Sequence, residues 1–251
     1  MTKIILQGAG GRMGKVVAAL VAAHKSCRIV AGVDVSNHTL DFPTYSALAD
    51  VREDADVLID FSHPSATENM LPFCAEHRLP CVVCTTGLPE STLALMLDAS
   101  AQTAVFHSAN MSLGINLLAA LVKKAQKALP DFDIEIIEKH HHHKLDAPSG
   151  TALLLADAIN RQANGCYQYV HERHSRREAR KKDEIGIHAV RGGSIVGEHD
   201  VLFAGPDETI TLSHSAFSRD VFANGAISAA LFLAGKSAGM YSMQDLFGDT
   251  I

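Results

Sequence analysis

Short, nearly continuous apolar runs alternate with amphipathic stretches over the first half of the chain. Apolar runs bounded by turn residues are typical of strands that are buried on both faces of a sheet. We expect strands at 3–7, 28–33, 56–61, 80–84 and 103–107, and helices at 16–23, 66–77, 93–100 and 114–129. Strands that alternate with helices predict an α/β fold, with a parallel sheet covered on both faces.

The pattern changes after Pro130. The remaining segments predict four further strands, at 134–138, 186–190, 193–203 and 208–215. They also predict two helices, at 152–162 and 219–235. Short glycine or proline turns separate the later strands, which predicts a largely antiparallel or mixed sheet. We therefore expect a first domain of residues 1–112 plus 220–251, with an α+β domain of residues 113–219 inserted near its end.

A glycine-rich loop follows the first strand. It reads Gly8-Ala9-Gly10-Gly11-Arg12-Met13-Gly14 and leads into the first helix. The spacing fits G-x-x-G-x-x-G and departs from G-x-G-x-x-G, because Met13 stands at the third glycine. Glycines at such a turn let backbone amides approach a pyrophosphate at the helix N-terminus. The loop predicts a Rossmann-like dinucleotide site, and a tight turn without a ligand is the alternative.

The second strand ends at Asp34, 20 residues beyond Gly14. A carboxylate there can accept hydrogen bonds from the adenosine ribose hydroxyls and disfavours a 2′-phosphate. Arg12 could nevertheless help to bind that phosphate. The sequence thus favours NADH as cofactor and leaves NADPH open, and an ordinary surface aspartate is the alternative.

Two polar loops follow later strands of the same sheet, Thr85-Thr86-Gly87 and Ala109-Asn110-Met111-Ser112. Ligands of parallel sheets bind at the carboxyl ends of the strands. We therefore expect both loops to line the nicotinamide side of the cofactor site, although either could be an ordinary polar loop.

Four consecutive histidines, His140 to His143, precede Lys144, Asp146 and the turn Pro148-Ser149-Gly150-Thr151. Histidines and a lysine can exchange protons near neutral pH, and the amides at a helix start, with the hydroxyls of Ser149 and Thr151, can hold a carboxylate. This combination predicts a site for chemistry on a small acid. Adjacent histidines on an extended segment point to opposite faces, which argues against a metal site. A solvated polar turn remains the alternative.

Charge and composition narrow the class of protein. The chain has 251 residues and a net charge of −6, which argues against general nucleic-acid binding. The basic run from Arg173 to Lys182 is a local exception, interpreted as a solvated face or a mobile loop. No apolar run approaches a membrane span and no signal peptide is recognised, so we expect a cytoplasmic protein. The cysteines, five in all, fit a reducing compartment, and Cys81-Val82-Val83-Cys84 is interpreted as core packing.

The glycine loop, the Thr85-Thr86-Gly87 loop and the segment from Glu138 to Ala152 together resemble the 4-hydroxy-tetrahydrodipicolinate reductase (dihydrodipicolinate reductase) family. The resemblance runs from residue 3 to about residue 248 in the same order. It implies reduction of 4-hydroxy-tetrahydrodipicolinate to tetrahydrodipicolinate, with NADH or NADPH, in lysine and diaminopimelate synthesis. It also implies a homotetramer built through the sheets of the substrate domain. Lys139, His142 and His143 depart from the usual family pattern.

The same resemblance assigns roles to residues. His140 is expected to donate or accept a proton, and Lys144 to donate one to the ring during reduction. His141, Gly150 and Thr151 are expected to contact the substrate carboxylates, and no metal is implied. The cofactor site is expected to comprise Gly8 to Met13, Asp34, Thr85 to Gly87 and Ala109 to Ser112. The first domain would thus bind the dinucleotide, and the second would bind substrate and form the oligomer.

Two alternatives remain, another enzyme and a protein of a different class. Another two-domain nicotinamide dehydrogenase, such as an aspartate-semialdehyde or homoserine dehydrogenase, would share the plan; the former needs a nucleophilic cysteine, for which no convincing catalytic loop is present. A non-catalytic NAD(P)-binding sensor would bind the cofactor without turnover. The pair His140 and Lys144 argues against a sensor, which has no need of proton donors.

Overall fold

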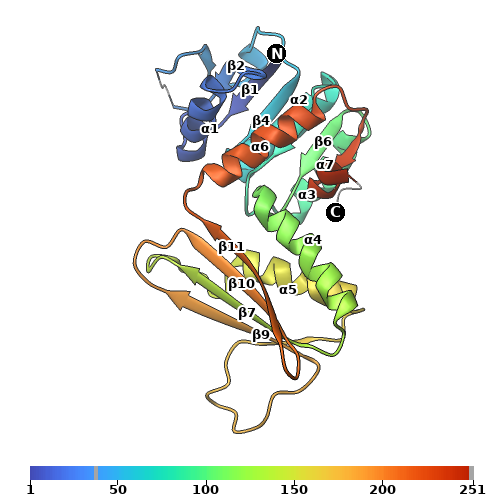
Figure 1. Ribbon diagram of the computed structural model, residues 1–251. Helices are drawn as coiled ribbons and strands as arrows, with labels where there is room; N and C mark the ends of the chain where they lie inside the picture. Colours follow the sequence, from blue (N-terminus) through green and yellow to red (C-terminus); the bar gives the residue numbers. More distant parts are fainter. Residues whose placement is uncertain (37–38, 249–251) are drawn as a thin grey trace. The chain divides into compact units, whose positions relative to one another are not determined.

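The computed structural model describes residues 1–36 and 39–248. The chain forms two compact units (Figure 1), one of residues 1–112 and the segment that begins at Asp220, the other of residues 113–219. The first domain was expected to end at residue 251, and residues 249–251 lie outside the described part. Each unit is described by itself.

The first unit contains a seven-stranded sheet in the order β12-β6-β5-β4-β1-β2-β3. All of its neighbouring strands are parallel, which confirms the α/β, Rossmann-like prediction. The strands are β1 Thr2–Gln7, β2 Cys27–Val33, β3 Thr44–Tyr45, β4 Val57–Asp60, β5 Cys81–Val83, β6 Ala104–His107 and β12 Gly239–Tyr241. The sequence did not reveal β3 (Thr-Tyr) and β12 (Gly-Met-Tyr), because neither lies in a run of apolar residues such as the one that marks β5.

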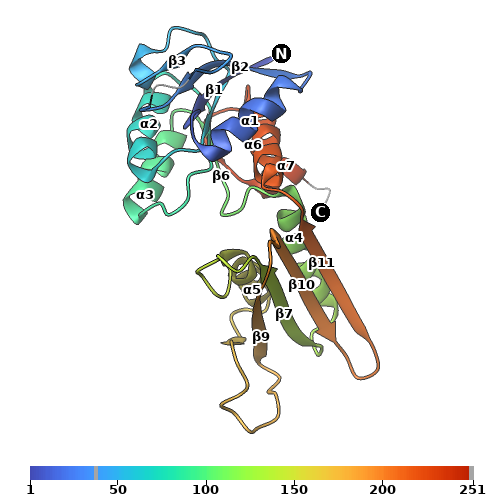
Figure 2. The same cartoon turned by 90° about the vertical axis from the view of Figure 1, so that its left-hand side faces the viewer.

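Helices cover both faces of this sheet, as Figures 1 and 2 show. Helix α1 packs against α6, which crosses β4, β5 and β6, while α2 and α3 lie together on the opposite face. Apolar side chains of the strands, such as Leu58, Val83 and Val105, pack there against Met70 and Met96. The helical segments are α1 Arg12–Ala22, the 3-10 turn Leu48–Asp50, α2 Pro64–Glu76, α3 Glu90–Ser100, α6 Asp220–Leu233 and α7 Met243–Phe247.

The second unit contains a five-stranded sheet in the order β11-β10-β7-β9-β8. Strand β9 is parallel to β7 and β8, and β10 is antiparallel to β7 and β11, so the sheet is mixed, as predicted. Consecutive strands β9 and β10 are not neighbours, because β7 lies between them. The strands are β7 Asp133–His140, β8 Gln168–Val170, β9 Glu184–Arg191, β10 Gly197–Ala204 and β11 Thr209–Ala216.

Helices α4 (Leu113–Ala128) and α5 (Gly150–Gln162) pack on one face of this second sheet. Their apolar residues, such as Val122 and Leu155, contact Ile134 and Ile136 of β7. Successive strand residues point to opposite faces. The even-numbered residues of β7 therefore lie on the helix-covered face, and its odd-numbered residues lie on an open face, where they are half-buried.

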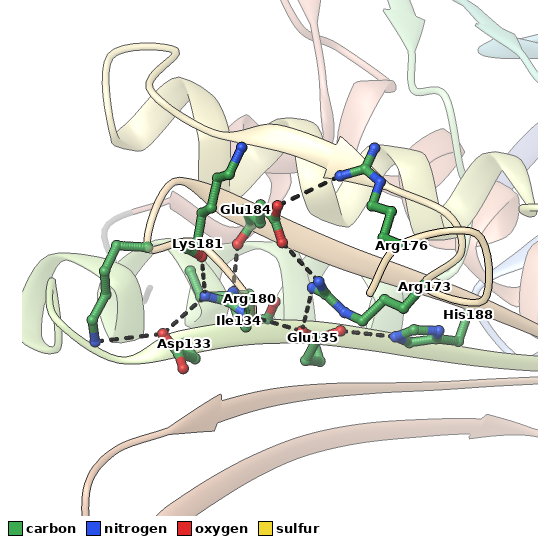
Figure 3. Close-up of polar contacts among 10 residues, drawn as sticks. Asp133, Ile134, Glu135, Arg173, Arg176, Arg180, Lys181, Glu184 and His188 are labelled. Atoms are coloured by element: carbon green, nitrogen blue, oxygen red, sulfur yellow. Dashed lines mark hydrogen bonds and ion pairs between the residues drawn. The ribbon is translucent and has the colours of Figure 1, made fainter. Parts of the chain in front are cut away.

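The basic segment after β8 is not simply solvated (Figure 3). Arg173 pairs with Glu184 at 2.9 Å, and Arg180 pairs with Asp133 at 2.8 Å and with Glu135 at 3.0 Å. These carboxylates belong to β7 and β9, so the arginines attach the loop to the sheet. Arg173 and Arg180 are half-buried, whereas the other residues of the run are exposed, so the interpretation as a solvated face holds except at these two arginines.

Two further sequence interpretations concern membrane-spanning helices and the role of Cys81 and Cys84. Among residues 1–36 and 39–248, no helix is both long and apolar enough to cross a membrane. Cys81 and Cys84 are buried free thiols, in agreement with a packing role. Burial raises the pKa of the Cys84 thiol well above its usual value, which keeps it neutral.

Candidate active site

A pocket of about 820 Å³ opens in the first unit, near the carboxyl ends of β4, β5 and β6. Its lining brings together residues of three segments that the sequence singled out separately, namely Arg12, Met13, Thr85, Thr86, Gly87, Ala109, Asn110 and Met111. The other predicted cofactor residues, Gly8, Ala9, Gly10, Gly11, Asp34 and Ser112, are not part of this lining. They lie in the same loops or at the end of the neighbouring strand β2.

The glycine loop has the steric character of a dinucleotide turn. Gly8 has φ +77°, and a Cβ there would lie 2.4 Å from the carbonyl oxygen of Phe61. A Cβ at Gly14 would lie 2.2 Å from the carbonyl oxygen of Gly8, so glycine lets α1 approach the strand. Gly11 caps α1 without a side-chain hydrogen bond, which leaves the amides of the first turn for a ligand. These features fit a diphosphate-bearing cofactor.

Asp34 lies beside the glycine loop. Its carboxylate accepts hydrogen bonds from the backbone N–H of Gly10 at 2.9 Å and of Ser36 at 3.0 Å. The loop and the carboxylate are therefore held together before any ligand is considered. This is the location that contact with a ribose would require.

Asp60 is a residue of this unit that the sequence reading missed. It is fully buried at the end of β4, and its carboxylate accepts hydrogen bonds from Thr67 Oγ1 at 2.6 Å and Thr85 Oγ1 at 2.9 Å. Gln7 Nε2 donates to the other oxygen at 3.3 Å. Asp60 thus fixes the loop that begins at Thr85. The only feature of the sequence that points to Asp60 is its position as an acidic residue at the end of an apolar strand.

The second unit holds the histidine segment. Strand β7 continues to His140, although the sequence predicted its end at Glu138, because residues 139 and 140 still pair with β9 and 139 with β10. His140 is buried, His141 is half-buried, and His142 and His143 are exposed. Within the described residues no cluster of His, Cys, Asp or Glu has the arrangement of a metal site.

Glu138 forms the centre of a hydrogen-bonded cluster behind His140. The carboxylate contacts His140 Nδ1 at 2.6 Å and the two terminal nitrogens of Arg191 at 2.7 and 2.8 Å. It also accepts the backbone N–H of Ser149 at 2.9 Å. Burial opposes ionisation of Glu138, yet the hydrogen bonds from Arg191, His140 and Ser149 prevail and lower its pKa. Glu138 is therefore a buried carboxylate that remains charged.

Ser149 is the N-cap of α5, as predicted, but its hydroxyl is not open to a ligand. It is only 2% exposed, accepts the N–H of Ala152 at 3.1 Å and lies 3.0 Å from His199 Nε2. Burial, followed by the charge of His140, lowers the pKa of His199 to about 4. His199 is consequently a neutral imidazole that holds the N-cap, and the exposed Gly150 donates its backbone N–H to an anion of the chain itself, the carboxylate of Asp146.

Lys144 lies in the loop between β7 and α5. Its ammonium group pairs with Asp146 at 2.9 Å, and the hydrogen bond from Lys144 is the main cause that lowers the pKa of Asp146. The backbone N–H of Lys144 donates to the carbonyl of His141 at 3.1 Å. Partial burial and the nearby cation Arg219 lower the pKa of His141. The loop therefore carries one fixed cation and one imidazole biased towards neutrality.

The predicted residues of this unit, His140, His141, Lys144, Gly150 and Thr151, thus lie at the end of one strand, in one loop and at one helix start. Sequence reasoning missed Arg191 and His199, and it gave Glu138 no role. Glu138 could have been found from the sequence, because it lies two residues before His140 and residues two apart on a strand share a face. Arg191 becomes visible only through the register that pairs it with His140.

The first unit has the fold and the glycine loop of a dinucleotide-binding domain, and the second carries imidazole and ammonium groups beside a helix start. This combination is that of a nicotinamide-dependent oxidoreductase with two domains. Family models agree in both units. "Dihydrodipicolinate reductase, N-terminus" matches residues 2–111, and "Dihydrodipicolinate reductase, C-terminus" matches residues 114–247.

Relatives extend over nearly the whole chain. The 4-hydroxy-tetrahydrodipicolinate reductase of Caldanaerobacter subterraneus subsp. tengcongensis is 55% identical, with 98% of each chain covered. The enzyme of the same name from Clostridium tetani is 48% identical, with 97% of this chain and 96% of the relative covered. Dipicolinate-bound dihydrodipicolinate reductase from Paenisporosarcina sp. TG-14 shares the fold, with a TM-score of 0.81, 24% identity and 98% coverage of both chains.

The chain belongs to the dihydrodipicolinate reductase family. The reaction of this family is the NAD(P)H-dependent reduction of 4-hydroxy-tetrahydrodipicolinate to tetrahydrodipicolinate in lysine and diaminopimelate synthesis. The chain is therefore an NAD(P)H-dependent oxidoreductase, as the sequence predicted. The fold alone would not have identified the reaction, because a DAP dehydrogenase from C. glutamicum has a similar fold, with a TM-score of 0.57 and 14% identity.

Proposed function

We propose that the second unit binds the dicarboxylate substrate and supplies its protons, with His140 and Lys144 as the catalytic residues. The observation that carries this proposal is the loop between β7 and α5, which places an ammonium group within a few residues of a buried imidazole and a helix start. Lys144 donates a proton to the ring as it is reduced, and its charge stabilises the negative charge that develops. His140 donates or accepts a proton in the same step.

The substrate carboxylates are assigned to His141, Gly150 and Thr151. Gly150 is exposed at the start of α5, where its backbone N–H bonds the carboxylate of Asp146 and the helix dipole favours an anion. Asp146 pairs with Lys144 in the described structure and is exposed. A substrate carboxylate can therefore replace it as the partner of Lys144 without any change in the buried cluster.

The first unit is the proposed cofactor domain, and a bound nicotinamide dinucleotide supplies the hydride. The glycine loop and the first turn of α1 bind the pyrophosphate, and Asp34 contacts the adenosine ribose. Thr85 to Gly87 and Ala109 to Ser112 orient the nicotinamide ring. Because Asp34 carries a negative charge beside the loop, NADH is the favoured cofactor, and Arg12 allows NADPH to be used as well.

Assembly and location follow the family expectation. We assign the protein to a homotetramer that forms through the sheets of the second unit. One face of that sheet carries half-buried side chains, including Ile137 and Leu202, with no described helix packed on it. We also place the protein in the cytoplasm, because all five cysteines are free thiols and Cys166 is exposed.

A coupled assay tests this function. Aspartate semialdehyde, pyruvate and the preceding synthase generate the unstable substrate in place, while the absorbance of the reduced nicotinamide is followed with NADH and with NADPH. The wild type should oxidise the cofactor only when the synthase is present, and the double variant His140→Ala with Lys144→Ala should lose this activity while still binding cofactor. Cofactor binding by the wild type without synthase-dependent oxidation would favour a sensor or another dehydrogenase.

A further inference from the structure

The contacts behind His140 form a closed set of hydrogen bonds. Glu138 has no exposed surface, and both of its carboxylate oxygens have two donors. One oxygen receives Arg191 and Ser149, and the other receives Arg191 and His140. An ionised carboxylate can only accept hydrogen bonds, so the proton of the contact with His140 belongs to its Nδ1 atom.

The position of this proton decides which nitrogen of His140 is left for chemistry. A neutral imidazole with its proton on Nδ1 presents an unprotonated Nε2. Nε2 faces Gly197 of β10, where a Cβ would lie only 3.0 Å from it, so the glycine leaves room for the ring, and the His140 side chain keeps 11% of its surface exposed. Carboxylates fix the tautomer of metal-bound and catalytic histidines in the same way.

We propose that Glu138 and Arg191 are positioning residues for proton transfer at His140. Glu138 holds the ring in the Nδ1–H tautomer, so that Nε2 exchanges protons with the substrate. Arg191 balances the charge of Glu138, so that the carboxylate remains ionised without holding His140 permanently as an imidazolium. This inference rests on the proposed function, because it gives His140 a role only if His140 transfers a proton.

Arg191 also connects the two proposed proton donors. The nitrogen of Arg191 that contacts Glu138 at 2.7 Å also donates to the backbone carbonyl of Asp146 at 2.7 Å. The side chain of Asp146 in turn pairs with Lys144 at 2.9 Å. One guanidinium therefore fixes both the strand end that carries His140 and the loop that carries Lys144. The planar fork of arginine suits this double contact, which lysine could not make.

Two further imidazoles, those of His199 and His141, lie close to His140. The ring of His199, from β10, lies 5.2 Å away from centroid to centroid, and its lowered pKa keeps it neutral above about pH 4. His141 interacts with His140 directly, and the charged or titratable groups that surround these imidazoles are His143, Lys144, Asp146, His214 and Arg219. The substitutions that test the inference leave all of these groups unchanged.

The first test uses the sign of a pH shift. Glu138→Gln removes a negative charge beside His140, so the limb of the kcat/KM profile that reports His140 should move to lower pH by about one unit. Arg191→Met removes a positive charge from the same cluster and should move that limb to higher pH by about as much. Arg191→Lys keeps the charge, so it should lower the rate and leave the limb in place. A purely structural role would lower activity without opposite shifts.

The second test does not depend on activity. Nitrogen-15 NMR of histidine-labelled protein, with the His140 signals assigned through His140→Gln, reports the tautomer directly. His140 should have its proton on Nδ1 in the wild type and a mixture of tautomers in Glu138→Gln. The matched control is Glu135→Gln, which removes the other glutamate–histidine contact of β7 on the opposite face. It should change neither the tautomer of His140 nor the pH limb.

The outcomes separate the inference from the proposed function. An Nε2–H tautomer in the wild type would overturn the inference, whatever the kinetics, and this measurement remains decisive if Arg191→Met fails to fold. Limbs that stay in place, or that shift in the same direction in both variants, would also overturn the positioning role. If the tautomer nevertheless responds to Glu138→Gln, the failure lies in the role proposed for His140 and not in the contact itself.

Discussion

Strand β7 carries two clusters of the same composition on its two faces. On the helix-covered face, Glu138 contacts His140 at 2.6 Å and Arg191 at 2.7 Å. On the open face, Glu135 contacts His188 at 2.8 Å and Arg180 at 3.0 Å (Figure 3). Both clusters therefore combine one glutamate, one histidine and at least one arginine.

Burial and attachment distinguish the two clusters. The side chain of Glu138 has no exposed surface and that of Glu135 is 23% exposed, while the histidine side chains are 11% exposed at His140 and 40% at His188. The open cluster attaches the basic loop to the sheet, and its arginines come from that loop. The covered cluster lies at the start of α5, beside the loop that carries Lys144. The same residue types thus anchor a loop on one face and, by our proposal, orient a proton-transferring imidazole on the other.

Two lysines, Lys144 in the loop beside the covered cluster and Lys139 on the open face of β7, give the largest expected contrast. Lys144→Ala should lower kcat by about 10²–10⁴-fold and leave the Kd for NADH nearly unchanged, because its role lies in the transition state. Lys139→Ala is the matched control: Lys139 pairs with Glu198 and Asp200 on the open face, at 3.0 Å each. It should retain most of the activity. An equal loss of cofactor binding in Lys144→Ala would remove the catalytic assignment.

Stability should also separate the two glutamates. Glu138→Ala leaves Arg191 partly buried without its carboxylate and should cost about 3–5 kcal/mol in the free energy of unfolding. Glu135→Ala breaks contacts that are partly exposed and should cost about 1 kcal/mol. Urea unfolding of both variants measures the difference. Equal losses would show that burial does not distinguish the clusters.

The covered face should make stability depend on pH through His199. Its pKa is lowered to about 4 in the folded chain, whereas an unfolded histidine titrates near pH 6.5. The unfolded state therefore binds more protons between these values, and stability should fall by up to about 3 kcal/mol as the pH decreases from about 6.5 to about 4. His199→Gln should remove this part of the dependence in urea unfolding at a series of pH values. An unchanged slope in the variant would assign the effect to other groups.

The smallest predicted effect lies in the first unit. Asp34→Ala should weaken NADH about tenfold and NADPH less, because the carboxylate bonds the ribose hydroxyls of NADH and repels a 2′-phosphate. Binding titrations with both cofactors measure the ratio. A ratio equal to that of the wild type would remove Asp34 from the ribose site.

The elements that could be predicted from the sequence are those whose burial leaves a regular pattern. The five main strands of the first unit were predicted because both of their faces are buried, and Ser149 was predicted as an N-cap because a small polar residue precedes an apolar helix. The short strands β3 and β12 leave no pattern. The contacts of the candidate site depend on which distant strands pair, and the sequence does not show that pairing. Strand β7 lies between β9 and β10, and only this arrangement places Arg191 beside Glu138.

The most direct test of the account compares the two histidines under one assay. His140→Gln and His188→Gln make the same substitution next to a glutamate on opposite faces of the sheet, and both are measured in the coupled assay with NADH. We expect His140→Gln to lose turnover by about 100-fold or more with normal cofactor binding, and His188→Gln to stay close to the wild type. Comparable losses in the two variants, or full activity in His140→Gln, would contradict this expectation.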